Sequence, residues 1–250
     1  DGVSGYLWTT DKLGYLCMST TIEDTTFQDE NKRLALASAI DTPAIVNAVM
    51  GSAGDPATSC LSENHWAYVN SAFTYDIDAA KDYLAAAGVP DGFSFNILVA
   101  SDQNLDVKLA EAIEAYLSQV GIKMEIRSAD QFSVMGEQMG GTQLCGILTS
   151  TIRGDVMELF DPFTDGSHNF LAQVPDAEFN EYLTAARMNS EMDVRTEALN
   201  NLQAYVHDHA TFIPLYQLNA AWGYQDYVSG VEDAAMGSEA ILDLTQVSFN

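Results

Sequence analysis

The clearest shortage in this 250-residue sequence is of positive charge. Only 10 Lys and Arg stand against 36 Asp and Glu, which gives a formal net charge of −26. Phosphate backbones and anionic membrane surfaces repel such a chain, so we expect no nucleic-acid partner. The sequence also lacks an apolar run of the roughly 20 residues that a membrane-spanning helix needs. We therefore expect no membrane span within it.

Cysteine is also scarce, with Cys17, Cys60 and Cys145 alone. The three form no C-x-x-C pair and show no spacing typical of a metal site. Cys17 and Cys145 fall in two expected strands, so a disulfide between them requires those strands to be neighbours, and the sequence leaves this open. The odd number leaves at least one thiol free.

Catalytic and metal-binding motifs are missing as well. Residues 161–166 resemble half of a calcium loop, but Phe163 occupies a ligand position and Ala172 stands where a bidentate Glu is required. His207 and His209 are two residues apart on an expected helix and therefore point to different faces. No glycine-rich phosphate loop occurs. We expect no catalytic residue, no metal and no cofactor.

What the sequence does contain is enough apolar material for a sizeable core, with 47% hydrophobic residues. The most informative segment is residues 31–51, which predicts two short helices with a stop between them. Asp41 is suited to cap the second helix, with Pro43 in its first turn. Gly51 suits the position just after that helix ends.

Helices and strands alternate along the middle of the chain, and the periodicity weakens after about Tyr224. This alternation predicts an α/β layered domain with a largely parallel sheet. The expected strands cover residues 15–20, 93–99, 122–127, 144–151 and 212–216. The expected helices cover two segments within residues 31–51 and residues 76–88, 104–120, 131–139, 177–188 and 194–209.

Several short motifs occur in an order that resembles the family 5 solute-binding proteins of ABC importers, the oligopeptide- and dipeptide-binding group. Each motif alone is weak, and their shared order is the specific signal. They are Ala-Ile-Asp at residues 39–41, Tyr-Asp at 75–76, Ala-Gly at 87–88, Gly-Phe at 92–93, Gly-Ile at 121–122 and Ile-Pro-Leu-Tyr at 213–216.

The resemblance implies one lobe of a two-lobed receptor with the periplasmic-binding-protein-like type II fold, a mostly parallel sheet flanked by helices. Residues 15–218 would be the C-terminal ligand-binding lobe, residues 1–14 a hinge or upstream segment, and residues 219–250 a tail that returns toward the missing N-terminal lobe. The start at Asp1 reads as a mature protein or an excised fragment.

In function, the resemblance implies non-catalytic capture of a small peptide or other small solute for the permease subunits of an ABC importer. The location would be extracellular or periplasmic, with an N-terminal lipid anchor outside this chain. Two other classes remain open from the residues: a hydrolase that uses acidic side chains, and the ligand-sensing module of a regulator.

The resemblance places the ligand near residues 146–155, a segment that covers the end of the expected strand 144–151 and the residues after it. Ile152 stands where relatives carry Trp, so the ligand class stays open. Arg153 would pair with a ligand carboxylate and Asp155 would hold a ligand ammonium; alternatively, the two form an ion pair that orders only their own loop. The candidate ligand-binding residues in this segment are Thr149, Ser150, Thr151, Ile152, Arg153 and Asp155.

A second candidate is the loop that carries His65, Trp66 and Tyr68. Aromatic side chains in a polar loop can stack on a ligand or cover the edge of the core. We include Trp66 among the candidate ligand-binding residues, with core packing as the alternative.

Overall fold

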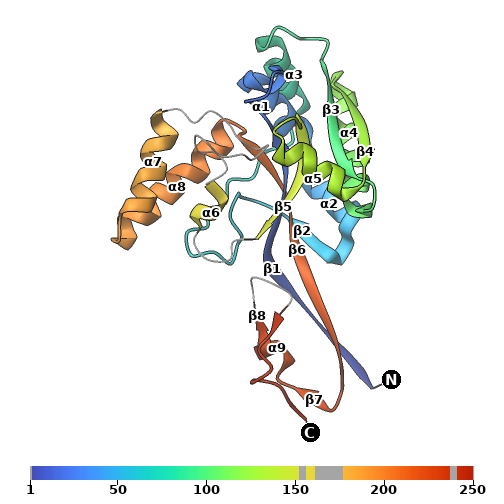
Figure 1. Ribbon diagram of the computed structural model, residues 1–250, viewed down its shortest axis with the longest axis vertical. Coiled ribbons are helices and arrows are strands. Elements are labelled where there is room, and N and C mark those ends of the chain that lie inside the picture. Colours follow the sequence, from blue (N-terminus) through green and yellow to red (C-terminus); the bar gives the residue numbers. More distant parts are fainter. Residues whose placement is uncertain (1, 152–155, 161–176, 237–240, 250) are drawn as a thin grey trace.

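The computed structural model describes residues 2–151, 156–160, 177–236 and 241–249. Its central feature is the antiparallel pairing of two long strands, β1 (Val3–Met18) and β6 (Phe212–Gln225). With β5 (Cys145–Thr151) and β2 (Gly54–Pro56) they form a four-stranded sheet in the order β2-β6-β1-β5. Part of the β1–β6 ladder lies among the helices, and the rest projects as a two-stranded ribbon (Figure 1).

Parallel pairing is confined to a second sheet. It joins β3 (Ser94–Ala100) to β4 (Lys123–Ala129), and α4 (Asn104–Leu117) is the crossover between them. The mixed α/β class is as expected, but a mostly parallel sheet is wrong for the described strands, because the four-stranded sheet is antiparallel throughout. A parallel pair needs a crossover connection, which α4 supplies between β3 and β4.

The predicted two-helix unit is confirmed as α1 (Glu30–Ala39) and α2 (Thr42–Met50). The Asp41 carboxylate accepts a hydrogen bond from the Ala44 N–H at 3.0 Å and so caps α2. Gly51 follows with a φ of 56°, a conformation that glycine adopts readily. No single helix in the described ranges is long and apolar enough to cross a membrane; α1 and α2 together reach that length and composition, but they are bent by 55°.

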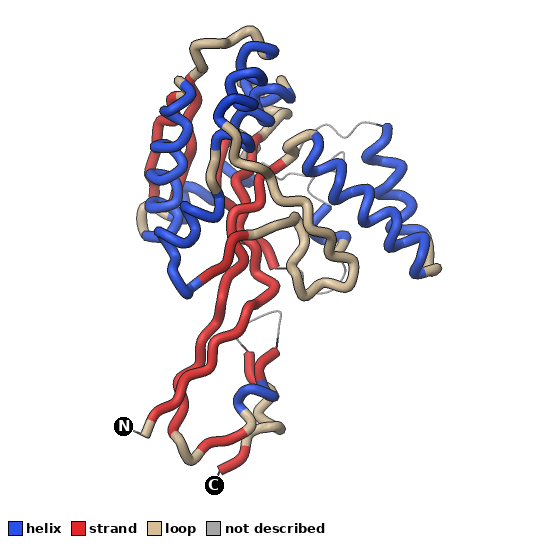
Figure 2. Tube along the Cα trace, turned by 180° about the vertical axis from the view of Figure 1, so that it is seen from behind, coloured by secondary structure: helices blue, strands red, loops and turns tan. Residues whose placement is uncertain are grey.

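The remaining elements flank the β1–β6 ladder. Helices α1 to α5 lie on one side of it, α7 and α8 form a hairpin on the other, and the C-terminal elements lie near the outer end of the ribbon (Figures 1 and 2). These elements are α3 (Ile77–Ala86), α5 (Gln131–Met139), α6 (Met157–Phe160), α7 (Ala177–Met188), α8 (Met192–Asp208), β7 (Val228–Ser229), α9 (Val231–Ala234), β8 (Ala235–Met236), β9 (Ile241–Leu242) and β10 (Ser248–Phe249).

Each face of the main sheet carries its own apolar core. Leu16 and Cys145 belong to the larger core, which includes residues of α1, α2 and α4. Tyr15 and Cys17 belong to the core that includes residues of α7 and α8. The strands of Cys17 and Cys145 are therefore neighbours, as a disulfide would need, but their side chains lie on opposite faces, and all three cysteines are free.

The two ribbon strands extend well beyond the ranges expected from the sequence, which were residues 15–20 and 212–216. β1 begins at Val3, and β6 continues to Gln225. Outside the core these segments are largely exposed or half-buried, so they lack the apolar alternation that marks a strand. Each is a strand because it pairs with the other, more than 200 residues away in the chain.

Candidate functional site

A buried tyrosine links three strands of the main sheet. Gly14 of β1 lies between Tyr216 of β6 and Thr149 of β5 in the strand register. The Tyr216 hydroxyl and Thr149 Oγ1 are 2.9 Å apart and share a hydrogen bond. A Cβ at position 14 would overlap the Tyr216 ring, so the ring passes over Gly14. Burial raises the pKa of Tyr216 to about 12, so the phenol is a neutral hydrogen-bonding group.

Near this tyrosine, a cavity of about 130 Å³ opens at the carboxyl ends of β3 and β4. Parallel strands bring these ends to one edge, where ligands of open α/β sheets bind. The chain enters α4 and α5 just beyond the strands, so the start of each helix contributes to the lining. The cavity is lined by Leu98, Val99, Ala100, Gln103, Asp106, Gln131, Val134, Met135, Gln138 and Ile147.

Asp106 is the charged residue of this lining. It lies half-buried in the first turn of α4, and burial raises the pKa of its carboxyl group to about 6. Burial is the main cause of the raised pKa of Tyr216, and the negative charge of Asp106 raises it further. Across the described part of the chain, the Asp106 carboxylate makes no hydrogen bond and no ion pair. The cavity therefore holds a carboxylate that is partly removed from water and that none of the described residues compensates.

Other charged groups near the carboxyl end of β4 have partners. Arg127 of β4 and Glu137 of α5 form a salt bridge at 3.1 Å. Asp130 caps α5 by accepting hydrogen bonds from the N–H groups of Phe132 and Ser133, both at 3.1 Å. The Ser133 hydroxyl also donates to this carboxylate, and this bond, together with the backbone bonds, holds the pKa of Asp130 below its usual value. Each of these charged groups thus has a partner, and Asp106 differs from them in this respect.

The structure describes only part of the site expected at the end of β5. Thr149 is exposed and Ser150 is half-buried, and Thr151 is the last residue of β5. Ile152, Arg153 and Asp155 lie outside the described residues, as do residues 161–166. The roles assigned to these side chains remain predictions.

Trp66 lies away from Thr149. Its loop packs on the sheet face that carries Tyr15, whose hydroxyl donates a hydrogen bond to the Cys60 carbonyl at 3.1 Å. Thr149 reaches Tyr216 on the opposite face. Trp66 itself is half-exposed, and its ring centroid is 5.2 Å from that of His65. The structure thus does not bring Trp66 into one site with Thr149, and its contact with a ligand stays a prediction.

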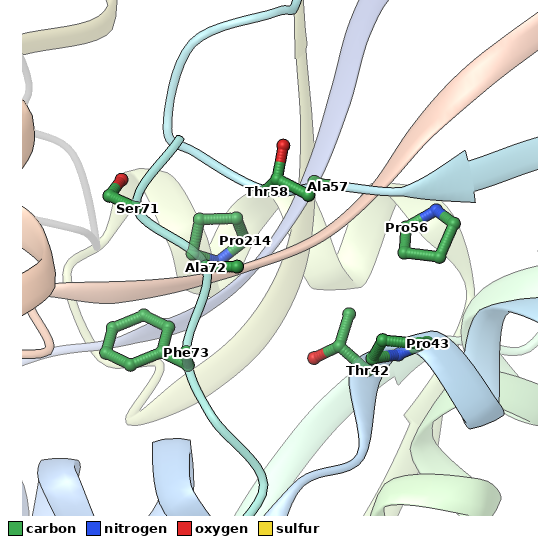
Figure 3. Close-up of a pocket in the computed structure, with 9 residues that line it drawn as sticks. All are labelled: Thr42, Pro43, Pro56, Ala57, Thr58, Ser71, Ala72, Phe73 and Pro214. Carbon is green, nitrogen blue, oxygen red and sulfur yellow. The ribbon is translucent and has the colours of Figure 1, made fainter. Parts of the chain in front are cut away.

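A second hollow lies between the start of α2 and the segments on either side of residues 59–70. Figure 3 shows Thr42, Pro56, Phe73 and Pro214 around it. Its volume is about 40 Å³, close to the roughly 30 Å³ that one water molecule takes up in the liquid. This hollow is too small for a solute, so the cavity beside Asp106 is the better candidate.

The buried cysteines do not form a reactive or metal-binding centre. Burial raises the pKa of Cys60 to about 12, and it also raises the pKa values of Cys17 and Cys145. Since the thiolate is the nucleophile and the metal ligand, these thiols are inert at neutral pH. Within the described ranges, no three His, Cys, Asp or Glu residues are grouped so that they could hold a metal ion.

Asp106 and its glutamine neighbours were not anticipated from the sequence. The available signal was the position of Gln103, Asp106 and Gln131, which are polar residues that directly follow two strands of one parallel pair. A β-α-β unit places both strand ends at one edge, so these residues were candidates for a shared site. These residues lie at one site only because β3 and β4 are neighbours.

Comparisons with known proteins point to one family. The family model described as "Bacterial extracellular solute-binding proteins, family 5 Middle" matches residues 6–170. The chain is 28% identical over 215 residues to heme-binding protein A of Haemophilus influenzae, and 25% identical over 209 residues to the dipeptide-binding protein of Escherichia coli. These alignments cover 81% and 79% of this chain and 39% of each relative.

Solved structures agree on the fold. The structure of HbpA2 from Haemophilus parasuis superposes with a TM-score of 0.87 at 20% sequence identity, and the match covers 100% of this chain and 50% of that one. The expected type II periplasmic-binding-protein-like fold is thereby confirmed. The chain spans about half the length of that protein and less than half of the curated relatives it matches.

Proposed function

The chain belongs to the bacterial extracellular solute-binding proteins of family 5, and from this premise we propose that it forms one side of a receptor that captures a small solute for an ABC importer. The simplest solute is a short peptide, given the dipeptide-binding relative. The role is non-catalytic: the receptor closes over the solute, removes it from water and presents it to the permease subunits. The relatives named above are binding proteins, which favours this role over a hydrolase.

The observation that carries the proposal is the one-sided site at the carboxyl ends of β3 and β4. Asp106 and the glutamines line a cavity there that remains open, and Tyr216 and Thr149 lie close by. A solute bound on this face would be covered only by a second body. A partner lobe that closes over the face would supply the other half of the cavity.

The ribbon supports a two-lobed arrangement. Three apolar side chains are exposed on it: Val3 (62%), Leu7 (48%) and Trp222 (37%). Val3 and Leu7 lie on one face of the ribbon, and Trp222, which pairs with Tyr6, lies on the other. Apolar side chains that are exposed on a projecting element favour a contact with another body. We assign residues 15–218 to the C-terminal lobe, residues 1–14 to a hinge or upstream segment, and residues 219–250 to a tail that returns toward an N-terminal lobe.

The segment after β5 completes the proposed site. Arg153 would bind a solute carboxylate through its planar guanidinium group, and Asp155 would bind a solute ammonium. Thr149, Ser150 and Thr151 precede them on β5 and would contribute hydroxyl groups, and Ile152 would contribute apolar surface. The receptor would work in the extracellular or periplasmic space, held at the membrane by a lipid on its N-terminal part.

The test is solute binding by the full-length protein. Calorimetry with a mixture of short peptides should give saturable binding, and mass spectrometry should recover the peptide unchanged. Arg153→Ala should weaken a peptide with a free C-terminal carboxylate by about 1.5–3 kcal/mol and should leave its C-terminal amide unaffected. Cleavage of the peptides, or the absence of any bound solute, would contradict the proposal.

A further inference from the structure

Asp106 is a carboxylate for which the described part of the chain supplies no partner. Its carboxylate is half-buried at the wall of the cavity, and none of the described residues gives it a cation or a hydrogen-bond donor. Removing a carboxylate from water is unfavourable unless another group compensates its charge. The cavity beside it is the space from which such a group can approach.

The cavity suits one class of group. Its polar lining comes from Asp106 and three glutamines, Gln103, Gln131 and Gln138. Its apolar lining includes Val134 and Met135. At about 130 Å³ it has room for about four water molecules at roughly 30 Å³ each. A lysine or arginine side chain likewise has a polar and an apolar part, because it carries a charged head on an aliphatic stem that packs on apolar surface.

We propose that Asp106 makes this receptor selective for solutes with a basic group, an ammonium or a guanidinium, which enters the glutamine-lined cavity and pairs with the carboxylate. This inference rests on the proposed function, because it requires that the solute bind on this face. The amide oxygens of the glutamines would accept the remaining N–H groups. The net charge of −26 acts in the same direction, since it attracts cationic solutes and repels anionic ones.

The charged surroundings add a dependence on pH. Tyr216 of β6 interacts with Asp106 and is neutral; Arg127 and Glu137 of β4 and α5 are paired with each other, and Asp130 caps α5. Protonation of Asp106 removes its charge, so the preference for a basic solute should fall as the pH drops below about 6.

The test uses the full-length protein and alanine tripeptides that carry one lysine or, at the same position, its uncharged analogue norleucine. At one of the three positions, the wild type should bind the lysine peptide at least tenfold more tightly than the norleucine peptide. Asp106→Asn should reduce this ratio of affinities to about one. Asp102→Asn is the matched control, because it removes the same charge from the exposed loop after β3. An unchanged ratio in Asp106→Asn would overturn the inference.

A second measurement does not depend on peptide binding. The pKa of the Asp106 carboxyl group can be followed by ¹³C NMR with n-butylammonium, and n-butanol is the uncharged control. We expect the ammonium to lower this pKa and the alcohol to leave it unchanged. If peptides fail to bind but the ammonium acts, the peptide function is wrong and the cation site stands. If peptides bind but neither lysine nor the ammonium has an effect, the cation site is wrong.

Discussion

Replacing Gly14 with alanine tests the contact that positions Tyr216. The new Cβ would overlap the Tyr216 ring, so the ring must move and its hydrogen bond to Thr149 is lost. Forcing an extra carbon into a packed core costs about 1–3 kcal/mol, and a lost hydrogen bond adds about 0.5–1.5 kcal/mol. We expect Gly14→Ala to lower the free energy of unfolding, measured with urea, by about 2–4 kcal/mol.

Gly5 provides the matched control, because it lies on the same strand and its nearest neighbour would be a backbone oxygen at 3.9 Å from the added carbon. Gly5→Ala should change the free energy of unfolding by less than about 0.5 kcal/mol. In the double variant with Tyr216→Leu, the effect of Gly14→Ala should shrink by at least about 1 kcal/mol, since the ring is gone. Equal effects of the two glycine variants would mean that the Tyr216 ring does not exclude a Cβ at position 14.

Four further predictions concern stability in urea. Gln203→Ala should cost roughly 2–4 kcal/mol, because this buried amide bonds four groups, among them the Ala67 carbonyl at 2.7 Å. Arg33→Met should cost about 2–3 kcal/mol, because the buried guanidinium donates to three carbonyls. Asp41→Ala should cost about 1 kcal/mol through loss of the α2 cap. Asp106→Asn should be more stable than the wild type above pH 6, and this gain should vanish between pH 6 and 4, because the folded-state pKa is raised from 3.8 to about 6. Unchanged stability of the first three variants, or a pH-independent difference for the fourth, would contradict these assignments.

Local signals in the sequence were sufficient for the longer helices, whereas the four-residue helices α6 and α9 were not predicted. Asp41, Pro43 and Gly51 mark the limits of α2 through interactions within a few residues, and the structure has the helix at that place. The same holds for β3 and β4, whose apolar alternation and turns are local.

The ribbon and the cavity were beyond such signals. The outer part of β1 is a strand because β6 lies beside it, and neither segment shows this alone. The value of Asp106 as a site residue likewise depends on where α4, α5 and β5 are placed in space. The need for glycine at position 14 is also a tertiary effect, because the side chain that excludes a Cβ there is a tyrosine about 200 residues away in the chain.

The most direct test of the account is the footprint of the bound solute on the full-length protein. Amide hydrogen exchange can be compared for the solute-free protein and the protein with its co-purified solute. We expect slower exchange in residues 101–106 after β3, in residues 130–135 after β4, and in residues 149–155, which include the end of β5 and the segment after it. We expect no change in residues 42–58 around the small hollow. Protection confined to residues 42–58, or elsewhere than the ends of these three strands, would contradict the account.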